Sequence, residues 1–502
     1  MQIQTTRHPE QATATRRSFL ESSTLAVAGL ATANLLQACA AEPTRQAGVF
    51  LHRGYNGWIT DRASNPDPHA PWPSLRIDER LLADYRETFE LMRRFGLNEI
   101  VIWGLYVANN WPVDIKSAVT EDRAKQVERL IASAHEHGIK VLSGLGTYSW
   151  GFANIIRANP SLSGGNPNAL CASKPESHAW MHRIVNFVFE RFPIDGVSMQ
   201  SADQGRCNCK QCAKLSDAEY HAELNVRTGD YIHAAWPHKV VGMSNWGLSF
   251  GNPKDEPAII RMSRSLDYMI DHNDSAQWGG SAYRRKLIGS LACAMGTTGG
   301  VVVEPPQHWA RDRWFLPSCG NVHAHLSELS ADGGRACELY YHILGNPSSE
   351  VTFYVAGRTL ADPHVSLPSA LAATLDELYE PRSPLTRDAL ARLFLDAEQA
   401  YMRYQPSNSC GTLSLEPLYS DGPGPAVYLR DHLQPVQRDA YAKDLDRLAI
   451  DFGKIRVGLR SATRVQRIDA CLKRVQADLR TLRISSCPME GWQHEGVRQH
   501  EV

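Results

Sequence analysis

Eight short apolar segments alternate with longer amphipathic segments between residues 49 and 339, and this alternation limits the possible folds more than any other feature. It predicts parallel strands joined by helical crossovers, as in α/β proteins. The expected strands are residues 49–52, 99–103, 140–144, 196–200, 240–244, 268–271, 301–304 and 335–339. The expected helices between them are residues 81–95, 123–137, 175–192, 218–236, 258–265 and 283–295.

The two kinds of connection between these segments differ in length. Links from helix to strand are short, as in Gly96-Leu97-Asn98, whereas links from strand to helix are long and rich in Trp, Asn, Asp and Arg. Long loops at the carboxyl ends of the strands predict a (β/α)8 TIM barrel with its active site on that face. A doubly wound open sheet is the alternative, but residues 52–57 lack the G-x-G-x-x-G spacing of a phosphate-binding turn.

The strand pattern ends near residue 350. From residue 365 to residue 485, Leu, Ala and Tyr recur at helical spacing. We therefore expect a catalytic barrel over residues 49–350, an α-helical C-terminal domain over 365–485 and a tail over 486–502. A length of 502 residues suits a barrel with an appended domain.

The first 39 residues have the features of an export signal. Thr15-Arg16-Arg17-Ser18-Phe19-Leu20 is a twin-arginine signature, and the apolar stretch over residues 24–36 is too short to anchor the chain in a bilayer. Leu36-Gln37-Ala38-Cys39 resembles a lipobox, in which Cys39 becomes the lipidated first residue; simple cleavage within residues 38–41 is the alternative. We expect a periplasmic or outer-membrane lipoprotein, with residues 40–48 as a linker.

The charge and the cysteine content argue against two classes of protein. A net charge of -1 does not suit a nucleic-acid-binding surface or a polybasic membrane surface. The 11 cysteines are scattered and odd in number, so they do not predict a disulfide scaffold. We expect membrane contact only through the lipid anchor.

The most specific short motif is a C-x-C-x-x-C run formed by Cys207, Cys209 and Cys212. Three thiols at this spacing predict either a structural zinc site, completed by a fourth ligand from elsewhere, or a disulfide formed after export. We expect no required cofactor beyond this possible zinc. Asp203 lies between the fourth expected strand and the motif, where barrel enzymes keep catalytic groups, although it could instead cap the loop or pair with Arg206.

A second candidate acid, Glu304, ends the seventh expected strand. Three Val residues precede it, and His308 and Trp309 follow it. Burial in such a setting should raise the pKa of Glu304 and suit it to donate a proton, whereas Asp203 beside Arg206 should stay ionised. A salt-bridged glutamate that closes the barrel is the alternative for Glu304.

Aromatic and polar residues gather at or just beyond the expected strand ends. Sugar rings stack on aromatic faces through their C–H groups, while sugar hydroxyls need polar partners. This concentration predicts a face that binds a polysaccharide or another glycan. The candidate substrate-binding residues are Arg53, Trp103, Tyr148, Trp150, Trp246, His272 and Trp309.

The segment Asp-Gly-Val-Ser-Met-Gln-Ser-Ala-Asp at residues 195–203, with the C-x-C-x-x-C run and the helix after it, resembles the glycosidase-like barrel family that includes glycoside hydrolase family 163. The resemblance covers residues 49–350 in outline and takes in the Glu304 strand and a helix around residues 339–347. It implies a glycosidase, since characterised members are endo-β-N-acetylglucosaminidases that use the acetamido group of the substrate as nucleophile. Ser201-Ala202 and Pro305-Pro306 depart from the family pattern.

Three functions fit these features. The leading one is an exported glycoside hydrolase in which Asp203 and Glu304 are the paired carboxylates. A polysaccharide lyase is the alternative enzyme, with Tyr or His as base and Arg53, Arg206 or Arg311 neutralising a uronate. A glycan-binding lipoprotein without catalysis is the third.

Overall fold

The computed structural model describes residues 49–60, 75–245, 248, 250–271, 280–297, 315–340, 346–404 and 435–484. The chain divides into two units, Met1–Thr44 and Arg45–Val502, and every described residue belongs to the second. The predicted export signal and linker lie outside the described residues.

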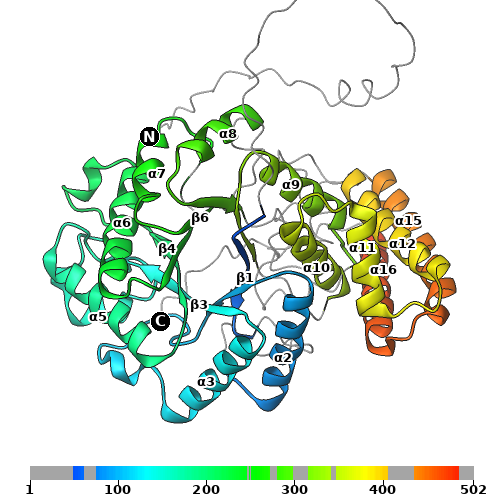
Figure 1. The fold of residues 1–502 in the computed structure, drawn as a ribbon, viewed down its shortest axis with the longest axis horizontal. Helices are drawn as coiled ribbons and strands as arrows, with labels where there is room; N and C mark the ends of the chain where they lie inside the picture. Colours follow the sequence, from blue (N-terminus) through cyan, green and yellow to red (C-terminus); the bar gives the residue numbers. More distant parts are fainter. Residues whose placement is uncertain are drawn as a thin grey trace, which may run out of the picture. The chain divides into compact units, whose positions relative to one another are not determined.

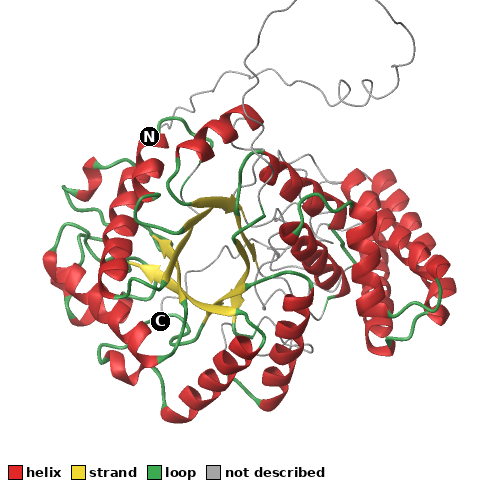
Figure 2. Ribbon diagram, in the orientation of Figure 1, coloured by secondary structure: helices red, strands yellow, loops and turns green. Residues whose placement is uncertain are grey.

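Eight parallel strands close into a barrel in the order of the sequence, with β1 hydrogen-bonded to both β2 and β8. Figure 2 shows the strands at the centre of the surrounding helices. The strands are β1 (His52–Trp58), β2 (Glu99–Trp103), β3 (Lys140–Thr147), β4 (Gly196–Ser201), β5 (Val240–Asn245), β6 (Tyr268–Asp271), β7 (Ala294–Thr297) and β8 (Ala336–Tyr340). This topology confirms the predicted TIM barrel and excludes the doubly wound sheet.

Helices surround the barrel (Figure 1). They are α2 (Glu79–Arg94), α3 (Glu121–Glu136), α4 (Ala153–Ala158), α5 (Pro175–Arg191), α6 (Asp217–Ala235), α7 (Glu256–Met262), α8 (Ser281–Ser290), α9 (Cys319–Ala331) and α10 (Pro347–Ala361). Local sequence explains several of their starts. Asp78 caps α2 through its side chain, and Ser216 and Glu219 form a reciprocal capping box at α6, which satisfies backbone N–H groups that the first helical turn leaves free.

The seventh strand is not where the sequence pattern placed it. The strand that pairs with β6 and β8 is Ala294–Thr297, whose first two residues we expected to end a helix, whereas residues 301–304 lie outside the described residues. The prediction that Glu304 ends this strand is therefore wrong. The sequence Ala-Met-Gly-Thr lacks the β-branched run that marks a buried strand, and Gly296 is required because a Cβ there would lie 1.5 Å from the carbonyl oxygen of Ala336.

Two other boundaries differ from the prediction. β1 begins at His52, where we expected the strand to end, and runs seven residues to Trp58. Leu339 and Tyr340 belong to β8, and the helix that follows begins at Pro347, so the expected helix around residues 339–347 is wrong. Leu339 and Tyr340 are part of β8 because they pair with residues of β1.

Further helices follow the barrel, as predicted. They are α11 (Leu367–Tyr379), α12 (Pro384–Tyr404), α15 (Pro435–Ile455) and α16 (Ala462–Ile484). Buried charges join them to the barrel helices. The carboxylate of Glu398 on α12 accepts hydrogen bonds from the backbone N–H groups of Gly320 and Asn321 at the start of α9, and Arg464 on α16 binds the buried carboxylate of Glu350 on α10. Within the described ranges, we find no helix with the length and apolarity to cross a bilayer.

Candidate active site at the ends of strands β3 and β4

The carboxyl ends of β3 and β4 lie side by side and carry unusual backbone conformations. Thr147 and Ser201, the last residues of the two strands, are register partners. The next residue in each case is left-handed without being glycine: φ is 63° at Tyr148 and 55° at Ala202. Such conformations cost about 1–3 kcal/mol each and cluster at functional sites. This part of the rim is therefore a candidate active site.

Asp203 follows the left-handed Ala202 and is exposed to solvent. Its carboxylate accepts a hydrogen bond from the side-chain amide of Gln200 at 3.3 Å. The surrounding protein removes enough water to raise the pKa of Asp203 to about 6, even though the side chain remains accessible. Desolvation rather than Arg206 therefore determines the direction of this shift, and a carboxyl group with a pKa of about 6 is still mostly ionised at pH 7.

Arg206 has other partners. Its guanidinium pairs with Asp217 at the start of α6, donates to the carbonyl oxygens of Cys212 and Leu215 at 2.9 Å, and lies over the ring of Tyr220. Through these contacts, Arg206 joins the first part of the loop between β4 and α6 to the last part of the loop and to the start of α6. Arg206 is therefore a loop-stabilising residue, and this role weakens its candidacy for neutralising a uronate.

Three tryptophans from β1, β2 and the loop after β3 form an aromatic cluster. The ring centroids of Trp58, Trp103 and Trp150 lie 5.2 to 6.1 Å apart. Two glycines of β3 make room for them, since a Cβ at Gly144 would lie 2.2 Å from Trp103 and one at Gly146 would lie 2.6 Å from Trp150. Trp58 and Trp103 are buried, whereas Trp150 is partly exposed.

A hydrogen bond brings this cluster next to the candidate acid. The backbone N–H of Gln204 donates to Ser149 at 3.0 Å, so the residue after Asp203 is joined to the residue before Trp150. Of the predicted site residues, Asp203 and Trp150 are therefore each one residue from this hydrogen bond between the two loops.

A buried acid, which sequence reasoning missed, lies inside the barrel below this rim. Glu338 of β8 accepts hydrogen bonds from Asn56, from Ser198 at 2.7 Å and from Tyr268 at 2.6 Å. Desolvation raises the pKa of Glu338. Asn56 in turn accepts from the indole N–H of Trp103 at 3.0 Å, so the network orients one wall of the aromatic cluster. A charged residue in the middle of an otherwise apolar strand was the available sequence signal.

Three predicted substrate-binding residues occupy positions that do not fit that role. Trp103 is buried, and its indole N–H donates to the side chain of Asn56 at 3.0 Å. Arg53 donates to the backbone carbonyls of Phe50 and Gly96, at the amino ends of β1 and β2 and thus opposite the strand ends that carry Asp203. Tyr148 has an exposed fraction of 0%, and its hydroxyl is hydrogen-bonded to His178 at 2.6 Å. These placements differ from the expectation because sequence position identifies the rim only to within a few residues. The remaining candidates, Glu304, Trp246, His272 and Trp309, lie outside the described residues, as does Arg311.

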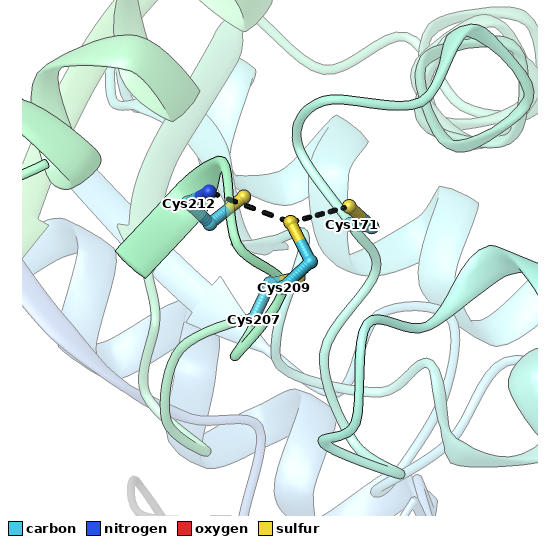
Figure 3. A group of neighbouring side chains, drawn as sticks. All are labelled: Cys171, Cys207, Cys209 and Cys212. Atoms are coloured by element: carbon cyan, nitrogen blue, oxygen red, sulfur yellow. Dashed lines mark hydrogen bonds between the residues drawn. The ribbon is translucent and has the colours of Figure 1, made fainter. Parts of the chain in front are cut away.

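The cysteines of the C-x-C-x-x-C run meet a fourth cysteine from another loop. Cys171, between β3 and α5, joins Cys207, Cys209 and Cys212, and the four sulfur atoms lie within 4.8 Å of one another (Figure 3). Burial raises the pKa of Cys212 to about 11. Burial acts in the same direction on Cys209, but hydrogen bonds to its sulfur outweigh it and lower the pKa to about 6. Nothing in the sequence near Cys171 indicated this role.

Comparisons with known proteins bear on the fold. No protein-family model matches the sequence, and no curated protein matches it, so the resemblance to the glycosidase-like family stays a prediction. Among solved structures, a mutant of the O-GlcNAc hydrolase of Thermobaculum terrenum is similar, with a TM-score of 0.50 and 13% identity over 86% of this chain and 83% of that chain. The chain shares its barrel fold with a glycosidase. A structure titled CpGH84B has a TM-score of 0.47 and 8% identity, and covers 87% of this chain and 69% of that one.

Proposed function

We propose that this protein is a glycoside hydrolase that cleaves a glycosidic bond of a poly- or oligosaccharide at the rim formed by β3 and β4. The observation that carries the proposal is Asp203, an accessible carboxyl group at the end of a barrel strand with a pKa of about 6. A proton donor for a glycosidic oxygen must remain partly protonated near neutral pH while staying open to substrate. Asp203 meets both conditions.

This proposal exchanges the roles expected for the two acids, since Glu304 was expected to donate the proton and Asp203 to stay ionised. Asp203 donates the proton to the leaving oxygen, and a second group stabilises the positive charge that develops on the sugar. Glu304 is the candidate second carboxylate, and an acetamido group of the substrate is the alternative. Trp150, which is partly exposed, contacts a sugar ring.

Substrates with N-acetylhexosamine units are the first class to test. The structural neighbour from Thermobaculum terrenum is an O-GlcNAc hydrolase, and the resemblance at the C-x-C-x-x-C loop also implies this sugar class. Both observations support the choice of substrate panel.

The experiment is digestion of a panel of aryl glycosides, including N-acetylglucosaminides, together with N-glycans and uronate polysaccharides. We expect new reducing ends and a kcat/KM that falls about tenfold per pH unit above pH 6, because Asp203 must be protonated to act. Products with the ultraviolet absorbance of an unsaturated uronate would instead identify a lyase. Binding without any product would identify a glycan-binding protein.

We also propose that the protein acts outside the cytoplasm, as a lipoprotein exported by the twin-arginine route. The twin-arginine signature and the Cys39 motif support this location. Replacement of Arg16 and Arg17 by Lys should leave the precursor in the cytoplasm. Cys39→Ala should release mature protein from the membrane, and unchanged membrane association of that variant would contradict the lipid anchor.

A further inference from the structure

We propose that Cys171, Cys207, Cys209 and Cys212 bind one Zn²⁺ ion that ties the loop after β3 to the loop after β4. The four sulfur atoms lie within 4.8 Å of one another, and those of Cys171 and Cys209 are 3.6 Å apart. Zinc–sulfur bonds of about 2.3 Å in a tetrahedron place the sulfur atoms about 3.8 Å from one another. The cluster therefore needs only small adjustments to close around the ion.

The ligand set identifies both the metal and its role. Four thiolates are soft ligands that favour tetrahedral zinc over hard ions such as Mg²⁺ or Ca²⁺. Cys171, Cys207 and Cys212 are buried, with exposed fractions of 0%, 1% and 2%. Four protein ligands fill the coordination sphere and leave no position for water or substrate, which is the arrangement of a structural zinc site.

Groups around the sulfur atoms are placed to hold them. The backbone N–H of Cys212 donates to the sulfur of Cys209 at 3.4 Å, and the hydroxyl of Ser173 lies 3.1 Å from the sulfur of Cys171 and 3.6 Å from that of Cys209. The hydroxyl of Tyr220 accepts from the backbone N–H of Cys207 at 3.1 Å. Such outer contacts orient ligands and stabilise the charge that thiolates carry in a metal site.

The two loops are packed closely enough for one ion to join them. Gly164 of the first loop presses directly on the cysteine loop, since a Cβ there would lie 2.4 Å from the sulfur of Cys207 and 2.7 Å from the Cβ of Cys209. Asn166 donates to the carbonyl oxygens of Gln204 and Arg206 at 3.1 and 3.2 Å. The ion would thus reinforce an existing contact at the segment that directly follows Asp203.

Zinc binding at this cluster is independent of the proposed glycosidase activity. Its test therefore reads metal content and thiol state rather than turnover. We would purify the full-length protein without a metal-binding tag, measure zinc by mass spectrometry of the elements, and count the cysteines that react with an alkylating agent before unfolding.

We expect about one zinc ion per chain. The four cysteines of this cluster should resist alkylation in the native protein and should react after unfolding in the presence of a chelator. Replacement of zinc by Co²⁺ should give the intense visible absorption of a tetrahedral thiolate site. Cys171→Ser and Cys209→Ser should lose the zinc, while Cys293→Ser, a matched thiol outside the cluster, should keep it. Cys171→His should retain zinc, because three Cys and one His also form a structural site.

Two outcomes would overturn the proposal. One is a native protein with a negligible zinc content whose four cysteines react freely. The other is a mass decrease that reveals disulfides among Cys171, Cys207, Cys209 and Cys212. Both are read on the wild-type protein, so neither depends on whether a variant folds.

Discussion

Two carboxyl groups of this barrel, Asp203 at the rim and Glu338 in the interior, both have a pKa raised by desolvation, yet their surroundings differ. Glu338 is fully buried and accepts hydrogen bonds from three side chains of three other strands. Asp203 is exposed and accepts a single long hydrogen bond among the described residues. A raised pKa alone therefore does not distinguish a reacting acid from a structural one.

The number of partners makes the distinction. A carboxyl group with several donors from different strands is held in place and stabilises the barrel, whereas an accessible one with few partners keeps its oxygen atoms available for a substrate. We therefore expect that loss of Glu338 lowers mainly the free energy of unfolding, and that loss of Asp203 lowers mainly the rate of turnover.

The largest expected effect is that of Asp203→Asn. The amide keeps the size of the side chain and can still accept from Gln200, but it cannot donate the proton, so kcat/KM should fall by about 10²- to 10⁴-fold. Asp230→Asn, on the exposed face of α6, is the matched control and should leave kcat/KM unchanged. Turnover close to wild type in Asp203→Asn would break the comparison and remove Asp203 from the chemistry.

Glu338→Ala should instead lower the free energy of unfolding. Loss of the carboxylate leaves the donors of Asn56, Ser198 and Tyr268 without this acceptor inside the barrel, at a cost of about 1–3 kcal/mol for each donor that stays unsatisfied. We expect a total loss of about 3 kcal/mol, measured by urea unfolding. Glu338→Gln should lose less, since its carbonyl oxygen still accepts. Equal stability of Glu338→Ala and wild type would contradict a structural role.

Trp150→Ala tests whether substrate binds next to Asp203 at this part of the rim. Loss of the partly exposed indole ring should raise KM about tenfold, or about 1.4 kcal/mol, with a smaller change in kcat. Trp150→Phe retains a stacking face and should recover most of the affinity. If Trp150→Ala leaves KM unchanged while the protein stays folded, the sugar binds elsewhere on the rim.

The last expected effect is a pH dependence of stability at Asp203, where solvent screening of the exposed carboxylate reduces the change. Because its pKa is about 6 in the folded protein and about 3.9 in an unfolded chain, the folded state holds more protons between these values. Stability should therefore decline as pH rises through this window and then level off. The melting temperature of Asp203→Asn relative to wild type should rise from pH 4 to pH 6, and a difference independent of pH would contradict the raised pKa.

Sequence alone was sufficient for most of the barrel, because hydrophobic period and loop length are local properties of the chain. The prediction from sequence failed at β7. This strand has no run of large apolar residues, and it fits beside β8 because Gly296 allows a close approach to Ala336. The prediction that Glu304 ends the seventh strand arose from the same comparison. The three valines before Glu304 matched a buried strand better than Ala-Met-Gly-Thr did.

The site was harder to predict because its contacts join distant parts of the chain. Arg206 is three positions from Asp203, but in three dimensions it binds Asp217, so proximity in sequence did not show that desolvation dominates the pKa of Asp203. Cys171 stands alone in its segment, 36 positions before Cys207, and no local spacing marks it as a partner of the other cysteines. Only the pairing of β3 with β4 brings the two loops together.

That separation has a consequence for how the chain folds. The cysteines flank α5 and β4, so a metal ion held by all four sulfur atoms closes this part of the chain into a ring. A chain that has lost the rest of its structure but keeps the ion would have less conformational entropy to lose on refolding, because its β3–β4 loop is already closed. The metal would then act as a pre-formed crosslink from which the barrel reassembles.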